Sequence, residues 1–176
     1  NLKSLVIPAS VTSFTSGLNY KYCRKLASIV VEEGNQVYDS RDNCNAVIQK
    51  SNNTLMLGCM NTIIPNTVKE IGAYAFDNCY GLLKIEVPES VTKINSYGFS
   101  TCIAATEVNL PNSLTYISGS AFYNCKSITS LKIPGSVTYI GATSFAECFA
   151  LKEIVLPKSV TTIGNNAFGS NTALEK

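Results

Sequence analysis

Apolar residues recur along this chain at a fixed spacing, and prolines mark the step. The last five of the six prolines are 23 residues apart. Counted from each proline, apolar residues take positions +3, +6, +17, +20 and +22, and a small residue precedes Phe at +11. The five prolines are Pro65, Pro88, Pro111, Pro134 and Pro157, and the phenylalanines are Phe76, Phe99, Phe122, Phe145 and Phe168. A repeat of this length predicts a solenoid in which each repeat forms one coil.

Each repeat predicts three short elements. Positions +17 to +22, such as residues 82–87, alternate apolar and polar near their end and predict a half-buried strand. A second extended piece covers +3 to +6, and glycine at +7 in three repeats permits a sharp turn after it. Positions +8 to +14, such as residues 73–79, predict a single helical or 3₁₀ turn. We therefore expect an α/β leucine-rich-repeat solenoid, right-handed and curved, with a parallel sheet of short strands on one face and short helical turns on the other.

The repeat divides the chain into one run of coils. The expected units are a partial repeat at 1–7, a degenerate repeat at 8–31, a longer repeat at 32–64, four regular repeats at 65–156 and a truncated repeat at 157–176. One extra residue shifts the degenerate repeat, so that Tyr20 and Cys23 take the Phe and Cys positions and Leu26, Ile29 and Val31 take the strand positions. Because both ends fall inside a repeat, we expect caps, targeting segments or other domains beyond them.

The longer repeat carries about ten extra residues, and these predict an inserted β-hairpin. Two apolar runs, residues 46–49 and 54–57, flank the turn-forming residues 50–53. A symmetric hairpin would pair Ile48 with Leu55, Val47 with Met56 and Cys44 with Cys59. The two cysteines would then form either a disulfide or a pair of adjacent buried thiols. Residues 61–64 predict the strand that precedes Pro65.

Cysteine recurs at +14, where it invites a metal or redox interpretation. The residues are Cys79, Cys102, Cys125 and Cys148, and the last repeat has Asn171 instead. Their spacing of 23 is far from the two to four residues of a zinc motif. We expect a column of small buried thiols that packs beside a stack of the Phe rings. One repeat cannot bury enough apolar surface to fold alone, so the coils must stack.

Composition and charge exclude several classes of function. The formal net charge of +2 gives no basic patch for nucleic acid or an acidic membrane, and no apolar run approaches membrane length. The chain has no His, which excludes Ser/His and Cys/His pairs and His-ligated metals here. Residues 39–43 resemble a calcium loop only loosely, and a turn with Asx hydrogen bonds is favoured. Glu70 and Lys93, at +5 of adjacent repeats, are expected to form an exposed ion pair of little worth. We expect no enzyme activity and no cofactor or metal.

The outward positions of the strands remain as the candidate binding surface. At +21 these are Val6, Val30, Ile63, Glu86, Asn109, Lys132 and Val155. The first three would present an apolar row, which often marks a partner site. At +5, Tyr116 and Tyr139 are neighbours; such aromatic pairs either contact protein or glycan, or simply cover the second sheet.

The pattern Pro-x-Ser-Val-Thr-x-Ile-Gly, continued by Phe-x-x-Cys-x-x-Leu-x-x-Ile-x-Leu in residues 134–156, resembles the BspA-type leucine-rich repeat of bacterial surface proteins. Residues 38–46, followed by 53–55 and 58–59, are similar to a unit that recurs in such proteins from gut bacteria. The resemblance covers essentially the whole chain. It implies a secreted or cell-surface bacterial protein whose partners include host extracellular-matrix proteins or other cells, and it carries over no catalytic residues.

Three hypotheses for function follow. The first is a non-catalytic adhesion module that binds a protein partner through the strand face. The second is a glycan-binding accessory module of a nutrient-uptake system, in which the tyrosines would matter most. The third is a structural spacer for a domain outside this chain.

Overall fold

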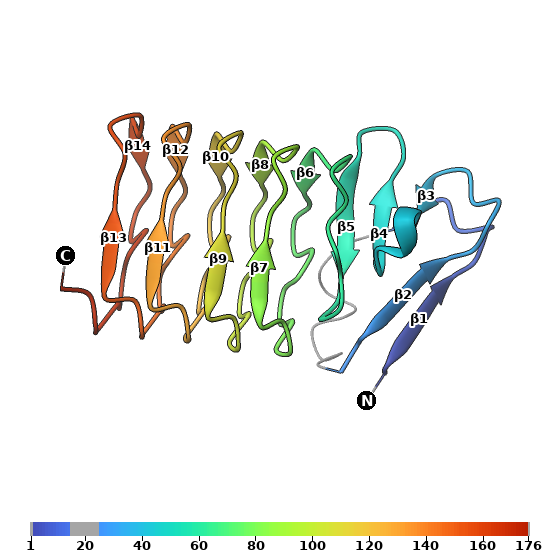
Figure 1. The fold of residues 1–176 in the computed structure, drawn as a ribbon, viewed down its shortest axis with the longest axis horizontal. Coiled ribbons are helices and arrows are strands. Elements are labelled where there is room, and N and C mark those ends of the chain that lie inside the picture. Colours follow the sequence, from blue (N-terminus) through green and yellow to red (C-terminus); the bar gives the residue numbers. More distant parts are fainter. Residues whose placement is uncertain (1, 15–24, 176) are drawn as a thin grey trace.

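The computed structural model describes residues 2–14 and 25–175, so Tyr20 and Cys23 lie outside the described residues. The chain forms a solenoid whose coils lie side by side, with the two termini at opposite ends (Figure 1). The N-terminal part contains β1 (Ser4–Ile7), β2 (Ser28–Val31), β3 (Tyr38–Asp39), the 3₁₀ turn η1 (Arg41–Asn43), β4 (Ala46–Gln49) and β5 (Thr54–Gly58). The predicted hairpin is confirmed as β4 and β5, which pair antiparallel. Leu26, Ile29 and Val31 of the degenerate repeat are buried, as expected.

The regular repeats contribute two sets of strands. The first set is β6 (Glu70–Ile71), β8 (Lys93–Ile94), β10 (Tyr116–Ile117), β12 (Tyr139–Ile140) and β14 (Thr162–Ile163). The second set is β7 (Lys84–Glu86), β9 (Glu107–Asn109), β11 (Ser130–Lys132) and β13 (Glu153–Val155). Within both sets the pairing is parallel and neighbouring coils are in register, which confirms the solenoid.

The continuous sheet lies on the side of the coil where the sequence predicted only a minor extended piece. An eight-stranded sheet runs β14-β12-β10-β8-β6-β5-β4-β3, through the two-residue strands at +5 and +6 and into the hairpin. The longer strands at +19 to +21 pair only two by two, as β1-β2, β7-β9 and β11-β13. The predicted parallel strands are therefore present on this side of the coil, but in the described residues they form three separate pairs. The name "strand face" is kept below for the side that carries these three pairs.

The segment from +8 to +14 forms consecutive turns instead of the expected helical turn. Positive φ recurs at +9 and +13, as in Tyr74 (59°) and Asn78 (59°), and this left-handed backbone interrupts a right-handed helix. Alternate amides bond within the coil and to the next coil: Ala75 N–H donates to Gly72 O, and Phe76 N–H donates to Gly98 O. The turns therefore form a third side that links neighbouring coils. The backbone amides, which in a helix would bond within the coil, supply those links.

The Phe column is confirmed. Ring centroids along Phe76, Phe99, Phe122, Phe145 and Phe168 are 4.8, 5.5, 5.3 and 5.7 Å apart, and every pair is stacked. In the cysteine column Cys79 is partly buried and the other three cysteines are buried. The Sγ atoms of Cys102, Cys125 and Cys148 donate to the Phe carbonyl of the preceding coil at 3.2 to 3.3 Å. Asn171 Nδ2 makes the same bond to Phe145 O at 3.0 Å. Position +14 therefore requires a small hydrogen-bond donor, which a thiol or an amide can supply.

Side-chain hydroxyl groups make further hydrogen bonds between coils. The Ser and Thr residues that supply them explain why the surface of this fold carries few charges. At +4, Thr115, Thr138 and Thr161 donate to the backbone carbonyl at +4 of the preceding coil. At +2, Ser113, Ser136 and Ser159 donate to the +3 carbonyl of the preceding coil. Glycine at +7 serves the same close stacking: a Cβ on Gly141 would lie 2.3 Å from Gly119 N. The +7 glycines in the stack have no positive φ, so close approach explains them better than a sharp turn.

The hairpin separates two hydrophobic cores. Ile48 and Leu55 belong to the core of the regular stack, whereas Val47 and Leu57 belong to a smaller N-terminal core. Ile48 pairs with Leu55 as predicted, but a bulge between Val47 and Ile48 pairs Val47 with Leu57 instead of Met56. Such a bulge inserts one unpaired residue and moves the following side chains to the other face.

The same bulge separates the two hairpin cysteines. Cys44 packs in the core of the stack and Cys59 in the N-terminal core, and both are free thiols, so the disulfide alternative is wrong for this structure. The hairpin also ends the Phe column. A Cβ on Gly58 would lie 2.1 Å from the Phe76 ring, so only glycine allows this ring to pack against β5.

Candidate functional site

The strand face carries the residues predicted at +21, and all seven are exposed. The structure brings them together in pairs: Val6 with Val30, Glu86 with Asn109, and Lys132 with Val155. Val6, Val30 and Val155 leave 54%, 47% and 61% of their surface exposed. Ile63 is the most exposed of the large apolar side chains described, at 77%, and it does not lie in a strand. The predicted row is therefore outward-facing but interrupted.

The interruption at Ile63 has a local cause. Its N–H donates to Cys44 O at 3.1 Å, and the neighbouring Thr62 Oγ1 donates to Asn45 O at 2.6 Å. Thr62 Oγ1 also accepts from Cys59 N–H at 2.7 Å. The segment before Pro65 is thus tied back to the loop that leads into the hairpin, and the strand predicted at 61–64 does not form.

A hollow of about 430 Å³ lies where this segment meets β7. Its lining is Thr62, Ile63, Ile64, Phe76, Leu82, Lys84, Ile85, Glu86, Val87, Pro88, Phe99 and Asn109. The floor is apolar and reaches the buried Phe rings, and the rim is polar. Lys84 Nζ lies 2.7 Å from Glu86 Oε1 and 3.2 Å from Glu107 Oε2, so the rim charges pair with one another. The hydrogen bond from Lys84 lowers the pKa of Glu86 and keeps this carboxylate ionised.

A second concavity, of about 530 Å³, lies over β11 and β13. Lys132, Glu153 and the exposed Val155 line it, together with Gly135 and Pro157. It is more apolar than polar, and both strands beneath it pair with each other.

The predicted tyrosine pair lies on the continuous sheet, away from the strand face. Tyr116 and Tyr139 stack with centroids 4.2 Å apart and planes 3° apart, and both are partly buried. Lys93 Nζ lies 5.3 Å from the Tyr116 centroid on the neighbouring coil. Burial and a hydrogen bond with Tyr139 raise the pKa of Tyr116. Lys93 therefore covers one face of the Tyr116 ring. The two tyrosine rings cover each other's facing sides.

The expected ion pair of Glu70 with Lys93 does not form. The two residues are direct neighbours in the sheet, but Glu70 Oε2 accepts from Asn95 Nδ2 at 3.0 Å and Lys93 lies over Tyr116. Both charged groups have found partners other than each other.

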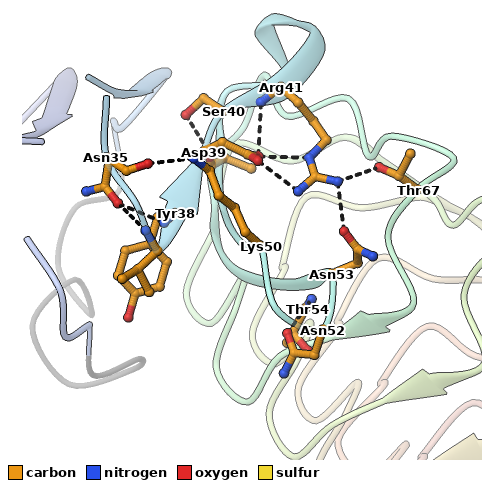
Figure 2. Close-up of polar contacts among 12 residues, drawn as sticks. Asn35, Tyr38, Asp39, Ser40, Arg41, Lys50, Asn52, Asn53, Thr54 and Thr67 are labelled. Atoms are coloured by element: carbon orange, nitrogen blue, oxygen red, sulfur yellow. Dashed lines mark hydrogen bonds and ion pairs between the residues drawn. The ribbon is translucent and has the colours of Figure 1, made fainter. Parts of the chain in front are cut away.

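A polar cluster at the N-terminal junction has no repeat signal, and sequence reasoning missed it (Figure 2). Asn35 is 1% exposed, and its side chain makes four hydrogen bonds. Nδ2 donates to Pro8 O and Val11 O, both at 3.0 Å, and Oδ1 accepts from the N–H groups of Val37 and Tyr38 at 2.9 and 2.8 Å. Asn35 thus connects the degenerate repeat to the hairpin repeat.

In the same cluster, the segment that loosely resembles a calcium loop is closed by an arginine. Arg41 Nε and Nη2 each lie 2.8 Å from a different oxygen of Asp39, and Arg41 Nη1 donates to Asn53 Oδ1 at 2.8 Å. Arg41 N–H also reaches Asp39 Oδ1 at 3.4 Å, as in the favoured Asx turn. Figure 2 shows the Asp39 carboxylate facing this guanidinium, which occupies the place a cation would need.

The described residues offer little reactive chemistry. Across residues 2–14 and 25–175, no group of His, Cys, Asp and Glu side chains is arranged to hold a metal ion. Burial raises the pKa of the Cys79 thiol to about 12 and that of Cys148 to about 11, so these thiols stay protonated at neutral pH. A protonated, buried thiol is a poor nucleophile. In the same described ranges, no helix has the length and apolar character that a bilayer crossing requires.

The stacked coils define a repeat solenoid, and comparison with known proteins places it further. The BspA-type leucine-rich repeat model matches residues 57–175 in six copies, and the chain belongs to this family. The chain is similar to a leucine-rich cell-surface protein of Faecalibacterium prausnitzii A2-165, with 32% identity and a TM-score of 0.86 over 99% of this chain and 47% of that one. It is also similar to a leucine-rich-repeat protein of Bacteroides ovatus, with 30% identity and a TM-score of 0.62 over 98% of this chain and 38% of that one.

The pneumococcal vaccine antigen PcpA shares the fold, at 24% identity and a TM-score of 0.78 over 97% of this chain and 44% of that one. The chain thus spans less than half the length of these solved structures. No curated protein matches it. The family and its fold are generally non-catalytic.

Proposed function

We propose that this chain is a non-catalytic module of a bacterial surface protein that binds a protein partner through the strand face. The observation that carries the proposal is the set of exposed apolar side chains on that face: Val6 beside Val30, Ile63 over the hollow, and Val155 over the second concavity. Large apolar side chains that gather on a soluble surface often mark a partner site. A host extracellular-matrix or cell-surface protein is the partner class we favour.

The surface location of this module is part of the proposal. It is supported by membership of the BspA-type family and by similarity to a protein described as a leucine-rich cell-surface protein.

Glycan binding through the tyrosines has less support. A sugar ring stacks on an open aromatic face, but Tyr116 and Tyr139 cover one another and Lys93 lies over the outer face of Tyr116. Tyr74 and Tyr97 also cover one another, with centroids 4.7 Å apart.

The test uses a panel of purified host matrix and cell-surface proteins immobilised for interferometry. Val30→Asp and Ile63→Asp each place a charge at an exposed position, so the fold should persist while affinity for a bound partner falls at least about tenfold. The matched control is Thr162→Asp, which places a charge at an exposed outward position of β14 in the eight-stranded sheet. Equal loss in the control, or unchanged affinity in both variants, would count against the strand face.

A further inference from the structure

Among the described residues β7 pairs only with β9, so its other edge is left unpaired. Leu83 O accepts from Thr106 N–H at 3.1 Å, and Val87 N–H donates to Asn109 O at 3.0 Å. In a parallel pair, alternate residues direct both backbone groups to the same neighbouring strand. The backbone N–H and C=O groups of Leu83, Ile85 and Val87 therefore point toward β9. Those of Lys84 and Glu86 point the other way, toward Ile63.

Across residues 2–14 and 25–175, no backbone group on the other side of the hollow bonds to these groups. Residues 60–64 and 83–87 are all described, and no backbone hydrogen bond joins the two segments. The reason is the bonding of Thr62 and Ile63 to residues 44 and 45, which draws that segment toward the hairpin. Two donors and two acceptors thus border a hollow of about 430 Å³ whose floor is apolar.

The chain treats the comparable edge of β2 differently. Val31 N–H, on the side of β2 that faces the hairpin, donates to Ser40 Oγ at 2.9 Å, and the same hydroxyl donates to Ala46 O at 2.7 Å. A side chain therefore bridges β2 to the hairpin across a gap between strands. At β7 no side chain among the described residues makes such a bridge to the backbone of Lys84 or Glu86.

We propose that the slot between residues 62–64 and β7 binds an extended peptide segment of a protein partner. The segment's backbone would bond to Lys84 and Glu86, as in strand addition to a sheet edge, and one of its apolar side chains would enter the hollow. Lys84, Glu86 and Glu107 pair with one another, so the rim of the hollow attracts neither sign of charge strongly. We therefore expect the bound peptide to have uncharged residues next to its apolar anchor. This inference rests on the proposed function and narrows it to one site and one conformation of the ligand.

The probe is a phage-displayed library of random linear peptides, selected against the whole chain. The expected outcome is enrichment of peptides with a single large apolar anchor, whose replacement by Ala weakens binding at least about tenfold. In the wild-type protein, the selected peptide should slow hydrogen exchange at the amides of Lys84 and Glu86 and leave the exchange at Lys132 unchanged. No enrichment, or protection elsewhere only, would overturn the proposal.

Proline substitution isolates the backbone contact. Glu86→Pro removes a free N–H and should weaken the selected peptide about tenfold, whereas Glu86→Ala keeps the N–H and should bind like wild type. Lys132→Pro is the matched control, because Lys132 has the same repeat position and its N–H also points away from its paired strand, since Thr129 O accepts from Lys152 N–H. Equal binding by Glu86→Pro and Glu86→Ala overturns the slot. A folded partner could lose affinity for Val30→Asp and Ile63→Asp but bind Glu86→Pro normally. That result would contradict the peptide slot and would still support binding through the strand face.

Discussion

The regular stack, residues 65–175, and the N-terminal junction, residues 2–14 and 25–64, join their coils by different chemistry. In the stack the same bonds recur from coil to coil; for example, Thr138 Oγ1 donates to Thr115 O, and Thr161 Oγ1 donates to Thr138 O. In the junction the polar contacts do not repeat. The single side chain of Asn35, for example, joins two segments through four hydrogen bonds. Repetition lets many modest interactions between neighbours add up. A single joint must instead satisfy every buried polar group where it stands.

The hydrophobic cores differ in the same way. The stack has one column of Phe rings in register, and every ring inside it has the same neighbours. The junction has a small core on the far face of the hairpin, and the hairpin bulge decides which side chains enter it. A substitution in the stack is therefore expected to act through packing, and one in the junction through unpaired polar groups.

The largest effect should come from the middle of the Phe column. Phe122→Ala removes a ring that is fully buried between two others and should destabilise the chain by about 3 to 5 kcal/mol. Phe168→Ala removes a partly exposed ring that, among the described residues, stacks only on Phe145, and should cost about 1 to 2 kcal/mol. Urea titrations followed by circular dichroism measure both. A loss below about 1 kcal/mol for Phe122→Ala would contradict the column as the source of stability.

The next effect should appear in the junction and stay there. Asn35→Ala leaves Val11 O and the amides of Val37 and Tyr38 without their partner, while Pro8 O keeps its bond from Val11 N–H, and should cost about 2 to 4 kcal/mol. Native-state hydrogen exchange should accelerate in β1 and β2 and change little in β10. The exposed Asn66, changed to Ala, is the control. Equal acceleration in β10 would mean that the junction and the stack unfold as one unit.

The contrast also explains how much of the fold could be predicted from the sequence. Phe at +11, Cys at +14 and the strand predicted at +17 to +22 recur, so the repeat gave each prediction at several places at once. The repeat pattern does not reveal which side of the coil carries the continuous sheet. That depends on the distance between the backbones of neighbouring coils on each side. The turns at +8 to +14 were also missed, because Tyr74 and Asn78 are not glycine and their residue types do not require a positive φ.

The candidate site was predictable only as far as it follows the repeat. The outward direction of Val6, Val30 and Val155 follows from alternation along a strand. The hollow beside Ile63 does not, because it depends on Thr62 and Ile63 bonding to the hairpin loop. That bonding follows from the insertion, which no other repeat of the chain contains.

A smaller effect would show that the repeat selects a donor at +14 and not a thiol. Asn171→Ala removes the bond to Phe145 O and the one that Asn171 Oδ1 accepts from Cys148 N–H, and should cost about 1 to 2 kcal/mol. Asn171→Cys should cost less, because a thiol can restore the bond to Phe145 O as it does in the three preceding coils. The free energies of unfolding measure both. If Asn171→Cys costs as much as Asn171→Ala, the thiol donors of the column are not what the position requires.

The smallest effect concerns a pair that the repeat brings together without joining. Glu70 and Lys93 are neighbours in the sheet, but Glu70 bonds to Asn95 and Lys93 lies over Tyr116. Glu70→Gln should therefore change stability by less than about 0.5 kcal/mol, while Lys93→Met should lose about 0.5 to 1 kcal/mol of cation–π attraction. In a double-mutant cycle the coupling between the two should be within about 0.3 kcal/mol of zero and insensitive to salt. A larger, salt-sensitive coupling would mean that the ion pair forms in solution, and that even in the stack the register of the coils decides which charges meet.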